Sequence, residues 1–239
     1  MKKLLLSLLV VAITAPFINA QKVINDANAE KREVGSFHGV SVATGIDLVL
    51  TNGTKEEVAV SAATNEFRDK IITKVENGIL RIYYETKTGS INKRKETKDL
   101  KAYVSYKSLS VLNVTTGAEV TINGILQSTK LDMTVNTGAL VTGEVDVTNL
   151  KVDQTTGSKV TLSGKAGTLD VEGSTGSKFK GEDMATSNCS VTVSTGAIVS
   201  VSAEKELQVK ASTGGNVKYK GTPSVREVKT STGGSVSKI

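Results

Sequence analysis

Apolar and polar side chains alternate with a period of two along most of the chain, and short polar tetrapeptides such as STGS at Ser174–Ser177 interrupt the alternation. In each copy, positions are counted from the glycine of the Thr-Gly pair. The residues seven before, five before and three after that glycine, compared across the copies, form three mainly apolar rows. The rows are Ser110, Leu131, Leu150, Leu169, Cys189, Leu207 and Arg226; Leu112, Met133, Val152, Val171, Val191, Val209 and Val228; and Val120, Val141, Val160, Phe179, Val199, Val217 and Val236. The intervening positions are mostly polar, which predicts two short, half-buried strands in each copy.

The Thr-Gly element recurs with a period near nineteen residues. From Gly117 onward the steps between successive glycines are 21, 19, 19, 20, 18 and 19 residues. Two strands in such a copy leave no room for a helix, and the period is too short for a four-stranded propeller blade. The pattern predicts an all-β fold, a parallel β-helix-like solenoid whose coils stack about 4.8 Å apart. The corner glycines are Gly45, Gly117, Gly138, Gly157, Gly176, Gly196, Gly214 and Gly233.

Small residues surround each corner glycine. Thr precedes the glycine in every copy, and Ala, Ser or Gly follows it in the seven later copies. Glycine permits the positive φ that a tight corner can require, and stacking of equivalent corners is expected to favour small side chains. We therefore interpret these glycines as structural corners, and a corner that contacts a ligand is the alternative.

The first copy, at Gly45, is separated from the others. The next corner glycine lies 72 residues later, so we expect an insertion of about residues 54–108. It would form a small N-terminal α+β cap over the open end of the solenoid, because repeat folds need such caps. The expected elements are a strand at Glu56–Ala62, a helix at Asn65–Val75 with Asn65 as its cap, and a strand at Ile79–Glu85.

The N-terminus has the order of a secretory signal peptide, with Lys2 and Lys3, an apolar run at Leu4–Ala15, and a cleavage site between Ala20 and Gln21. Cleavage leaves 219 residues and lowers the formal net charge from +6 to +4. No second long apolar segment follows, so we expect no membrane span in the mature chain. The expected location is the periplasm, the cell surface or the medium. The expected divisions are a signal peptide at 1–20, an N-terminal extension at 21–36 and a single domain at 37–239.

Few residue types suited to catalysis or metal binding are present. Cys189 is the only cysteine and His38 the only histidine, so we predict no internal disulfide, no metal site and no cofactor. Cys189 takes the place of a leucine in the row seven before the glycine, which predicts a buried, inert thiol. The mild net charge disfavours nucleic acid as a partner. The basic segment Lys87–Lys101 is interpreted as a solvated loop, with a patch for an anionic partner as the alternative.

Four stretches carry a resemblance to a known family. They are the opening FHGVSVATGIDLVLTNGTKEEVAVSA, the later VENGILRIYYE, the array of small-residue corners and the ending GTPSVREVKTSTGGSVSKI. Over Phe37–Ile239 the chain resembles the head GIN domain of the putative auto-transporter adhesins, which is common in Bacteroidota. Family members typically have Ser-Gly-Ser-Gly at the corners, whereas this chain has Thr-Gly followed by Ala, Ser or Gly. The resemblance implies an exported β-helix-like domain and supplies no catalytic residues.

Several classes of function remain open, and the sequence leaves the oligomeric state undecided. The favoured class is a non-enzymatic, exported surface or envelope protein that binds a glycan or a surface protein along its stacked faces. The alternatives are an envelope scaffold without a small ligand, a polysaccharide-cleaving enzyme, and, more remotely, an ice-binding array of threonines. Glycoside hydrolysis needs two carboxylates on either side of the bond that is cleaved. The candidate outward acids are Asp132, Asp153, Asp170 and Glu172.

Overall fold

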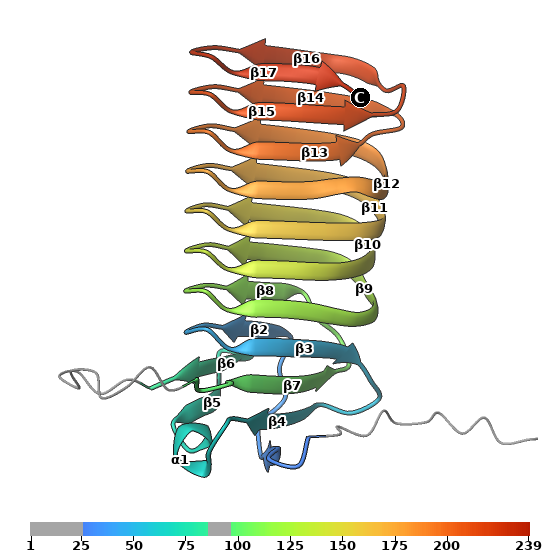
Figure 1. Cartoon of the computed structure of the whole chain (residues 1–239). Helices are drawn as coiled ribbons and strands as arrows, with labels where there is room; N and C mark the ends of the chain where they lie inside the picture. Colours follow the sequence, from blue (N-terminus) through green and yellow to red (C-terminus); the bar gives the residue numbers. More distant parts are fainter. Residues whose placement is uncertain (1–25, 86–96) are drawn as a thin grey trace, which may run out of the picture.

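The computed structural model describes residues 26–85 and 97–239. These residues form an all-β solenoid of about seven coils of about 19 residues, with a mixed sheet and one short helix at the N-terminal end (Figure 1). The predicted fold class is therefore confirmed. The elements are β1 (Glu30–Arg32), β2 (Gly39–Val42), β3 (Asp47–Asn52), β4 (Glu57–Ser61), α1 (Asn65–Arg68), β5 (Ile71–Glu76), β6 (Ile79–Tyr84), β7 (Lys101–Tyr106), β8 (Val111–Val114), β9 (Glu119–Val135), β10 (Leu140–Gln154), β11 (Lys159–Gly173), β12 (Lys178–Val193), β13 (Ile198–Ser202), β14 (Glu206–Ala211), β15 (Asn216–Lys220), β16 (Ser224–Thr230) and β17 (Ser235–Lys238).

Each coil crosses two flat faces, which we call the front face and the back face. After a Thr-Gly corner the chain runs along the front face, formed by β3, β13, β15, β17 and the first halves of β9 to β12. It then bends and returns along the back face, formed by β2, β8, β14, β16 and the second halves of β9 to β12. In Figure 1 the corners lie on the left and the bends on the right.

Neighbouring coils pair in parallel and in register, so equivalent side chains stack into rows inside the solenoid. Val141, for example, pairs with Val120 on one side and Val160 on the other, and all three are fully buried. Burying an aliphatic side chain of this size contributes about 1.5–3 kcal/mol relative to leaving it in water. The three predicted apolar rows thus form much of the hydrophobic core.

The last coil departs from the simple alignment. Leu207 pairs with Val225, and the register shifts immediately afterwards, so that β16 contains one extra residue. The alignment that placed Arg226 in the inner leucine row is therefore wrong. Arg226 lies outside the core, where its guanidinium group forms an ion pair with Glu206.

The corners are turns in which both central residues have positive φ. The threonines have φ between 46° and 66°, and the glycines that follow have φ between 66° and 76°. These angles match a type I′ turn. In the seven later corners, the N–H of the residue after the glycine donates to the carbonyl of the residue before the threonine at 2.8–3.3 Å. A β-branched residue rarely adopts this conformation, and the positive φ of the threonine was not expected from the sequence.

Small residues at the corner have two different causes. A Cβ added to Gly176 would have no atom within 4 Å, so the glycine is needed for its φ and not for space. The crowded position is the next one, where Ala118 and Ala139 are fully buried. A Cβ at Gly234 would lie 2.2 Å from the carbonyl oxygen of Ala211. The crowding that favours small side chains therefore acts on the residue after the corner glycine.

The expected helix at Asn65–Val75 is also mostly wrong. The helix α1 covers only Asn65–Arg68, and its N-cap is Thr64, whose hydroxyl accepts a hydrogen bond from the N–H of Phe67 at 3.3 Å. The following residues form β5, which pairs antiparallel with β6. This stretch contains the β-branched sequence Ile-Ile-Thr, and pairing buries Ile71 to 2 % exposure. Strand pairing therefore prevails over the helical spacing of apolar residues.

The insertion extends the solenoid and then covers it. Strand β6 pairs parallel with β2 and β7 pairs parallel with β3, which adds one layer below the Gly45 coil. Beyond this layer, β4 pairs antiparallel with β7, and β1 pairs antiparallel with β4. An ion pair of 2.8 Å between Arg68 and Glu30 joins the α1 helix to β1. Figure 1 shows these elements below the regular coils.

We predict that Gly176→Val lowers the free energy of unfolding by at least about 1–2 kcal/mol, because a side chain makes the positive φ unfavourable. Denaturant unfolding measures the change. Gly176→Asn is the matched control, since Asn tolerates this conformation and the site has room for it. Equal losses in the two variants would show that φ is not the cause.

We further predict that Thr175→Asn raises the free energy of unfolding by about 0.5 kcal/mol or more, because Asn-Gly is the preferred pair of a type I′ turn. Thr161→Asn, in the extended backbone of β11, is the control and should give no gain, since Asn is unfavourable in strands. A destabilised Thr175→Asn protein would contradict the strain assigned to the threonine.

Candidate functional site

A shallow depression lies on the back face beside the corners. Its floor and rim come from four neighbouring coils, and it is open to solvent. It is lined by Thr134, Lys151, Asp153, Gln154, Thr155, Glu172, Gly173, Ser174, Thr192 and Ser194. In-register stacking brings these residues together, because each pair of neighbouring strands places equivalent side chains side by side.

Charged groups occupy the centre of the depression. The Lys151 ammonium group lies 3.6 Å from a carboxylate oxygen of Asp153 and 3.7 Å from one of Glu172. Asp153 and Glu172 are register partners on β10 and β11. Both carboxylates raise the pKa of Lys151 above its ordinary value, and Asp153 makes the larger contribution. All three groups are about half exposed, so the cluster is a solvated ion network on an open surface.

A buried polar side chain lies under this network. Gln154 is 4 % exposed and occupies an inward row in which neighbouring coils have Val135 and Gly173. Its amide donates to the carbonyl of Lys178 at 3.2 Å. Its amide oxygen and one carboxylate oxygen of Asp153 are buried and have no hydrogen-bond partner among the described residues. Gly173 is the register partner of Gln154, and both residues line the depression.

A row of small polar side chains borders the depression along the corners. The hydroxyl of Ser174 donates to that of Thr155 at 3.1 Å, and the hydroxyl of Thr115 donates to the amide oxygen of Asn136. The row continues through serines in the later coils. It consists of Thr115, Asn136, Thr155, Ser174, Ser194, Ser212 and Ser231. These groups can exchange hydrogen bonds with the hydroxyls or amides of a partner.

The structure brings together only part of the predicted set of acids. Asp153 and Glu172 lie side by side, Asp170 pairs with Lys151 across the β10–β11 ladder, and Asp132 pairs with it across β9–β10. Asp132 also forms an ion pair of 2.8 Å with Lys130. All of these acids project from one flat face, so they do not face one another across a groove as glycoside hydrolysis requires.

Sequence reasoning did not identify Gln154 as part of a site. A signal was present, because Gln154 replaces a small or apolar residue in an inward row of the alignment. Asp153 and Glu172 were expected as outward acids, and Lys151, which lies between them, was not part of that set. The alignment on the corner glycines already places Asp153 and Glu172 at equivalent positions, and the structure adds the side-chain contacts with Lys151.

Cys189 is buried, at 4 % exposure, in the inner row between Leu169 and Leu207. Burial, with a smaller contribution from Asp170, raises the pKa of its thiol to about 12. Its predicted place in the leucine row is confirmed. The thiol stays protonated near neutral pH and is a poor nucleophile or metal ligand in that state.

Two expectations fall wholly or partly outside the described residues. Cleavage between Ala20 and Gln21 lies outside them, as do residues 86–96 of the basic segment. At the end of that segment, the Lys98 ammonium group lies 4.3 Å from the ring centre of Tyr84, and Lys101 forms an ion pair of 2.8 Å with Asp99.

Residues 26–85 and 97–239 contain no group of three or more His, Cys, Asp or Glu side chains that could hold a metal ion. In the same two segments, no helix has the length and apolar character needed to cross a bilayer.

Comparison with known proteins identifies relatives by family and by fold. Residues 36–223 match the family described as "Putative auto-transporter adhesin, head GIN domain". No curated protein matches the sequence. The fold is similar to that of a "putative adhesin" from Bacteroides fragilis, with a TM-score of 0.75, 16 % identity and coverage of 88 % of this chain and 95 % of that one.

Two structures from Parabacteroides have the same fold. A "putative adhesin" from Parabacteroides merdae has a TM-score of 0.66 and 15 % identity, with 88 % of this chain and 95 % of that one covered. A "putative lipid binding protein" from Parabacteroides distasonis has a TM-score of 0.66 and 18 % identity, with 90 % and 98 % covered. At these identities the likeness establishes the fold alone.

We predict that stability decreases with alkaline pH partly through Cys189. Because the folded pKa of about 12 exceeds the ordinary thiol value, the folded state binds more protons than the unfolded state between these two values. The free energy of unfolding should therefore fall by about 1.4 kcal/mol per pH unit above about pH 8.5. Unfolding of the wild type and Cys189→Ala across this range tests the slope, and parallel curves would contradict the assignment.

Proposed function

Because this chain belongs to the family described as putative auto-transporter adhesins with a head GIN domain, we propose that it is an exported, non-enzymatic surface or envelope protein that recognises a glycan or a protein. The proposal has two parts, the location outside the cytoplasm and the binding of a macromolecule along the solenoid. The family membership supports the first part and the shape of the solenoid supports the second.

The observation that carries the proposal is the flatness and regularity of the two faces. Successive strands repeat the same side-chain positions about every 4.8 Å over all the coils, and the depression on the back face is shallow. A small molecule is usually enclosed by its pocket. A flat, extended surface instead favours a long or broad partner that contacts several coils at once.

The distribution of polar groups also favours spread-out contact. Lysines, carboxylates and hydroxyls project from both faces. Among the described residues, the exposed large apolar side chains Ile125 and Ile198 lie on separate coils, and the others, Val225, Val228 and Ile239, lie in the last coil. Most of the contact energy would then come from many weak polar interactions, because an exposed ion pair contributes only about 0–1 kcal/mol. The contact would be distributed instead of centred on one residue.

We predict that purified residues 21–239 bind at least one polymer on a panel of glycans and host-matrix proteins. Single substitutions such as Glu172→Gln or Lys178→Gln should weaken binding by less than about fivefold, because each removes one exposed charge. Surface plasmon resonance with each panel member gives the affinities.

A turnover assay with a broad polysaccharide panel separates this proposal from the enzyme alternative. We expect no cleavage products. Cleavage that disappears in Asp153→Asn or Asp170→Asn would refute a purely binding function. Failure to bind any member of the panel would favour the envelope scaffold instead.

A further inference from the structure

Four lysines project from one region of the front face, which we call the lysine patch. It consists of Lys159, Lys178, Lys180 and Lys218. Lys159 and Lys178 are register partners on β11 and β12, so their Cα atoms lie about 4.8 Å apart. Lys180 and Lys218 are both register partners of Ser200, one on each side of it, which places them about 10 Å apart. The patch therefore covers the outer surface of four neighbouring front strands.

The lysines of the patch are not paired with acids in the described residues. None of its four lysines forms an ion pair within the described part of the chain, whereas Lys151 on the back face contacts two carboxylates. The outward positions between the lysines hold Thr161, Ser200 and Asn216, together with Ile198. They contain no acid.

One acid borders the patch, since Glu182 follows Lys180 by two residues on β12. The other acids on this side of the molecule lie farther away. Glu119 is two strands away from Lys159 in the same row. Asp183, toward the bend, forms an ion pair of 3.6 Å with Lys220.

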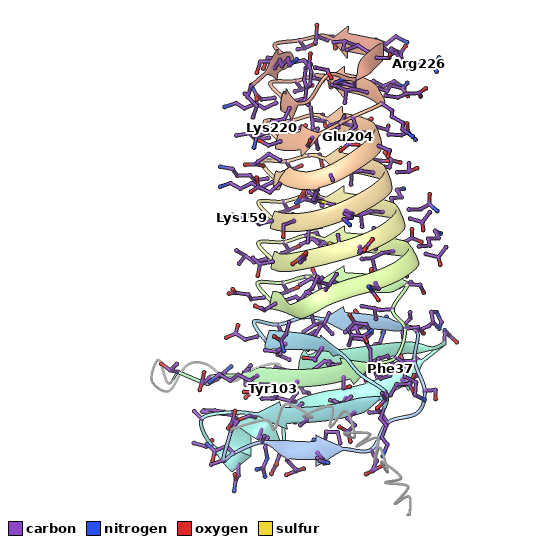
Figure 2. The ribbon with its side chains drawn as sticks, turned by 90° about the vertical axis from the view of Figure 1, so that its right-hand side faces the viewer. Phe37, Tyr103, Lys159, Glu204, Lys220 and Arg226 are labelled. Carbon is purple, nitrogen blue, oxygen red and sulfur yellow. The ribbon has the colours of Figure 1, made fainter. Side chains whose placement is uncertain are left out.

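The two faces thus differ in charge at the same level of the solenoid. On the back face, β10 and β11 hold Asp153, Asp170 and Glu172 around Lys151, whereas β14 farther along holds both Glu206 and Lys210. Figure 2 shows the two sides, with Lys159 and Lys220 projecting to the left and Arg226 to the right. Unpaired lysines on a flat surface create a positive potential that concentrates anions there. A polyanion would therefore approach the front face and avoid the acidic coils of the back face.

The groups between the lysines indicate which polyanion fits. No aromatic side chain projects from these positions, and the whole chain contains no tryptophan. Binding of single-stranded nucleic acid relies on aromatic stacking. Sequence reading of duplex DNA needs a helix or ribbon that enters a groove, which a flat sheet does not present.

Hydroxyls and an amide between the charges suit the hydroxyls of a sugar polymer. A protein partner would be expected to need aromatic or apolar anchors, and Ile198 is the single exposed large hydrophobe beside the patch.

We propose that the lysine patch binds an anionic polysaccharide, a linear sugar polymer that carries carboxylate or sulfate groups. This inference rests on the proposed binding function and specifies both its face and its ligand class. The lysine ammonium groups pair with the acidic groups of the polymer. Thr161, Ser200 and Asn216 exchange hydrogen bonds with its hydroxyls. The regular spacing of strands lets one chain contact several coils in succession.

The experiment measures binding of the purified protein to immobilised heparin, which is sulfated, and polygalacturonate, which is carboxylated, with neutral dextran beside them. The triple variant Lys159→Gln, Lys178→Gln and Lys180→Gln should lose about tenfold in affinity for the acidic polymers. The affinity of the wild type should fall with rising salt more steeply than that of the variant, because fewer counterions are released in the variant.

The matched control is Lys165→Gln, Lys205→Gln and Lys210→Gln, which removes the same net charge from exposed positions on the bend and the back face. It should bind within about twofold of the wild type, because these lysines lie away from the patch. The Lys→Arg version of the patch variant should retain binding because it keeps the charge. Thermal unfolding of each protein verifies that the exposed substitutions leave the fold intact.

Several results would overturn the inference. Equal losses in the patch variant and its control would mean that net charge alone governs binding. Duplex DNA bound as tightly as the polysaccharides would mean that any polyanion suffices. Binding of a neutral glycan or a protein, without binding of heparin or polygalacturonate, would reject the lysine patch and leave the proposed function standing. Absence of every interaction would reject both.

Discussion

Stacking of the corners in register is the constraint on which the whole molecule depends. In every coil from that of Gly45 to that of Gly214, the N–H of the corner glycine donates a hydrogen bond to the carbonyl of the corner threonine in the next coil, at 2.9–3.1 Å. That bond requires the backbone to turn within two residues, both with positive φ. A corner opened by one residue would turn the side chains of the strand that follows it to the wrong face, because strand side chains alternate. The threonines accept an unfavourable conformation, and the hydrogen bonds on both sides of the stack keep them in it.

A fixed register converts a one-dimensional repeat into a two-dimensional surface. Once equivalent residues stack, the inner rows form a continuous apolar core and the outer rows form lines of chemically related groups. The same register places Asp153 beside Glu172 on the back face and Lys159 beside Lys178 on the front face. Function in this fold is therefore determined by which residues occupy equivalent positions in neighbouring coils. A change in one coil alters one position in a row and leaves the scaffold intact.

The fold could be predicted because its two periods, two and about nineteen, are both visible in the sequence. The errors occurred where local pairing departs from those periods. The alignment placed Arg226 at the position of the inner leucine row, because an extra residue in β16 cannot be recognised from spacing alone. The stretch after Arg68 was assigned to a helix because its apolar residues fit helical spacing, whereas pairing with β6 determines its actual structure. The depression was missed although Gln154 and Gly173 stand at equivalent positions before their corner glycines, because its shape depends on side-chain packing that spacing does not describe.

The flat faces also determine how selectivity can arise. An exposed lysine paired with one acidic group contributes little, because water solvates both charges well. Binding through such groups becomes strong only when many pairs form at once on a single polymer, since each further contact is then intramolecular. The spacing of charges along the partner must then match the spacing of coils. A solenoid meets this requirement without a deep pocket, because its rigid core holds the outer rows at a constant separation. The strand spacing that the corner hydrogen bonds enforce is thus also the spacing with which the surface can discriminate one polymer from another.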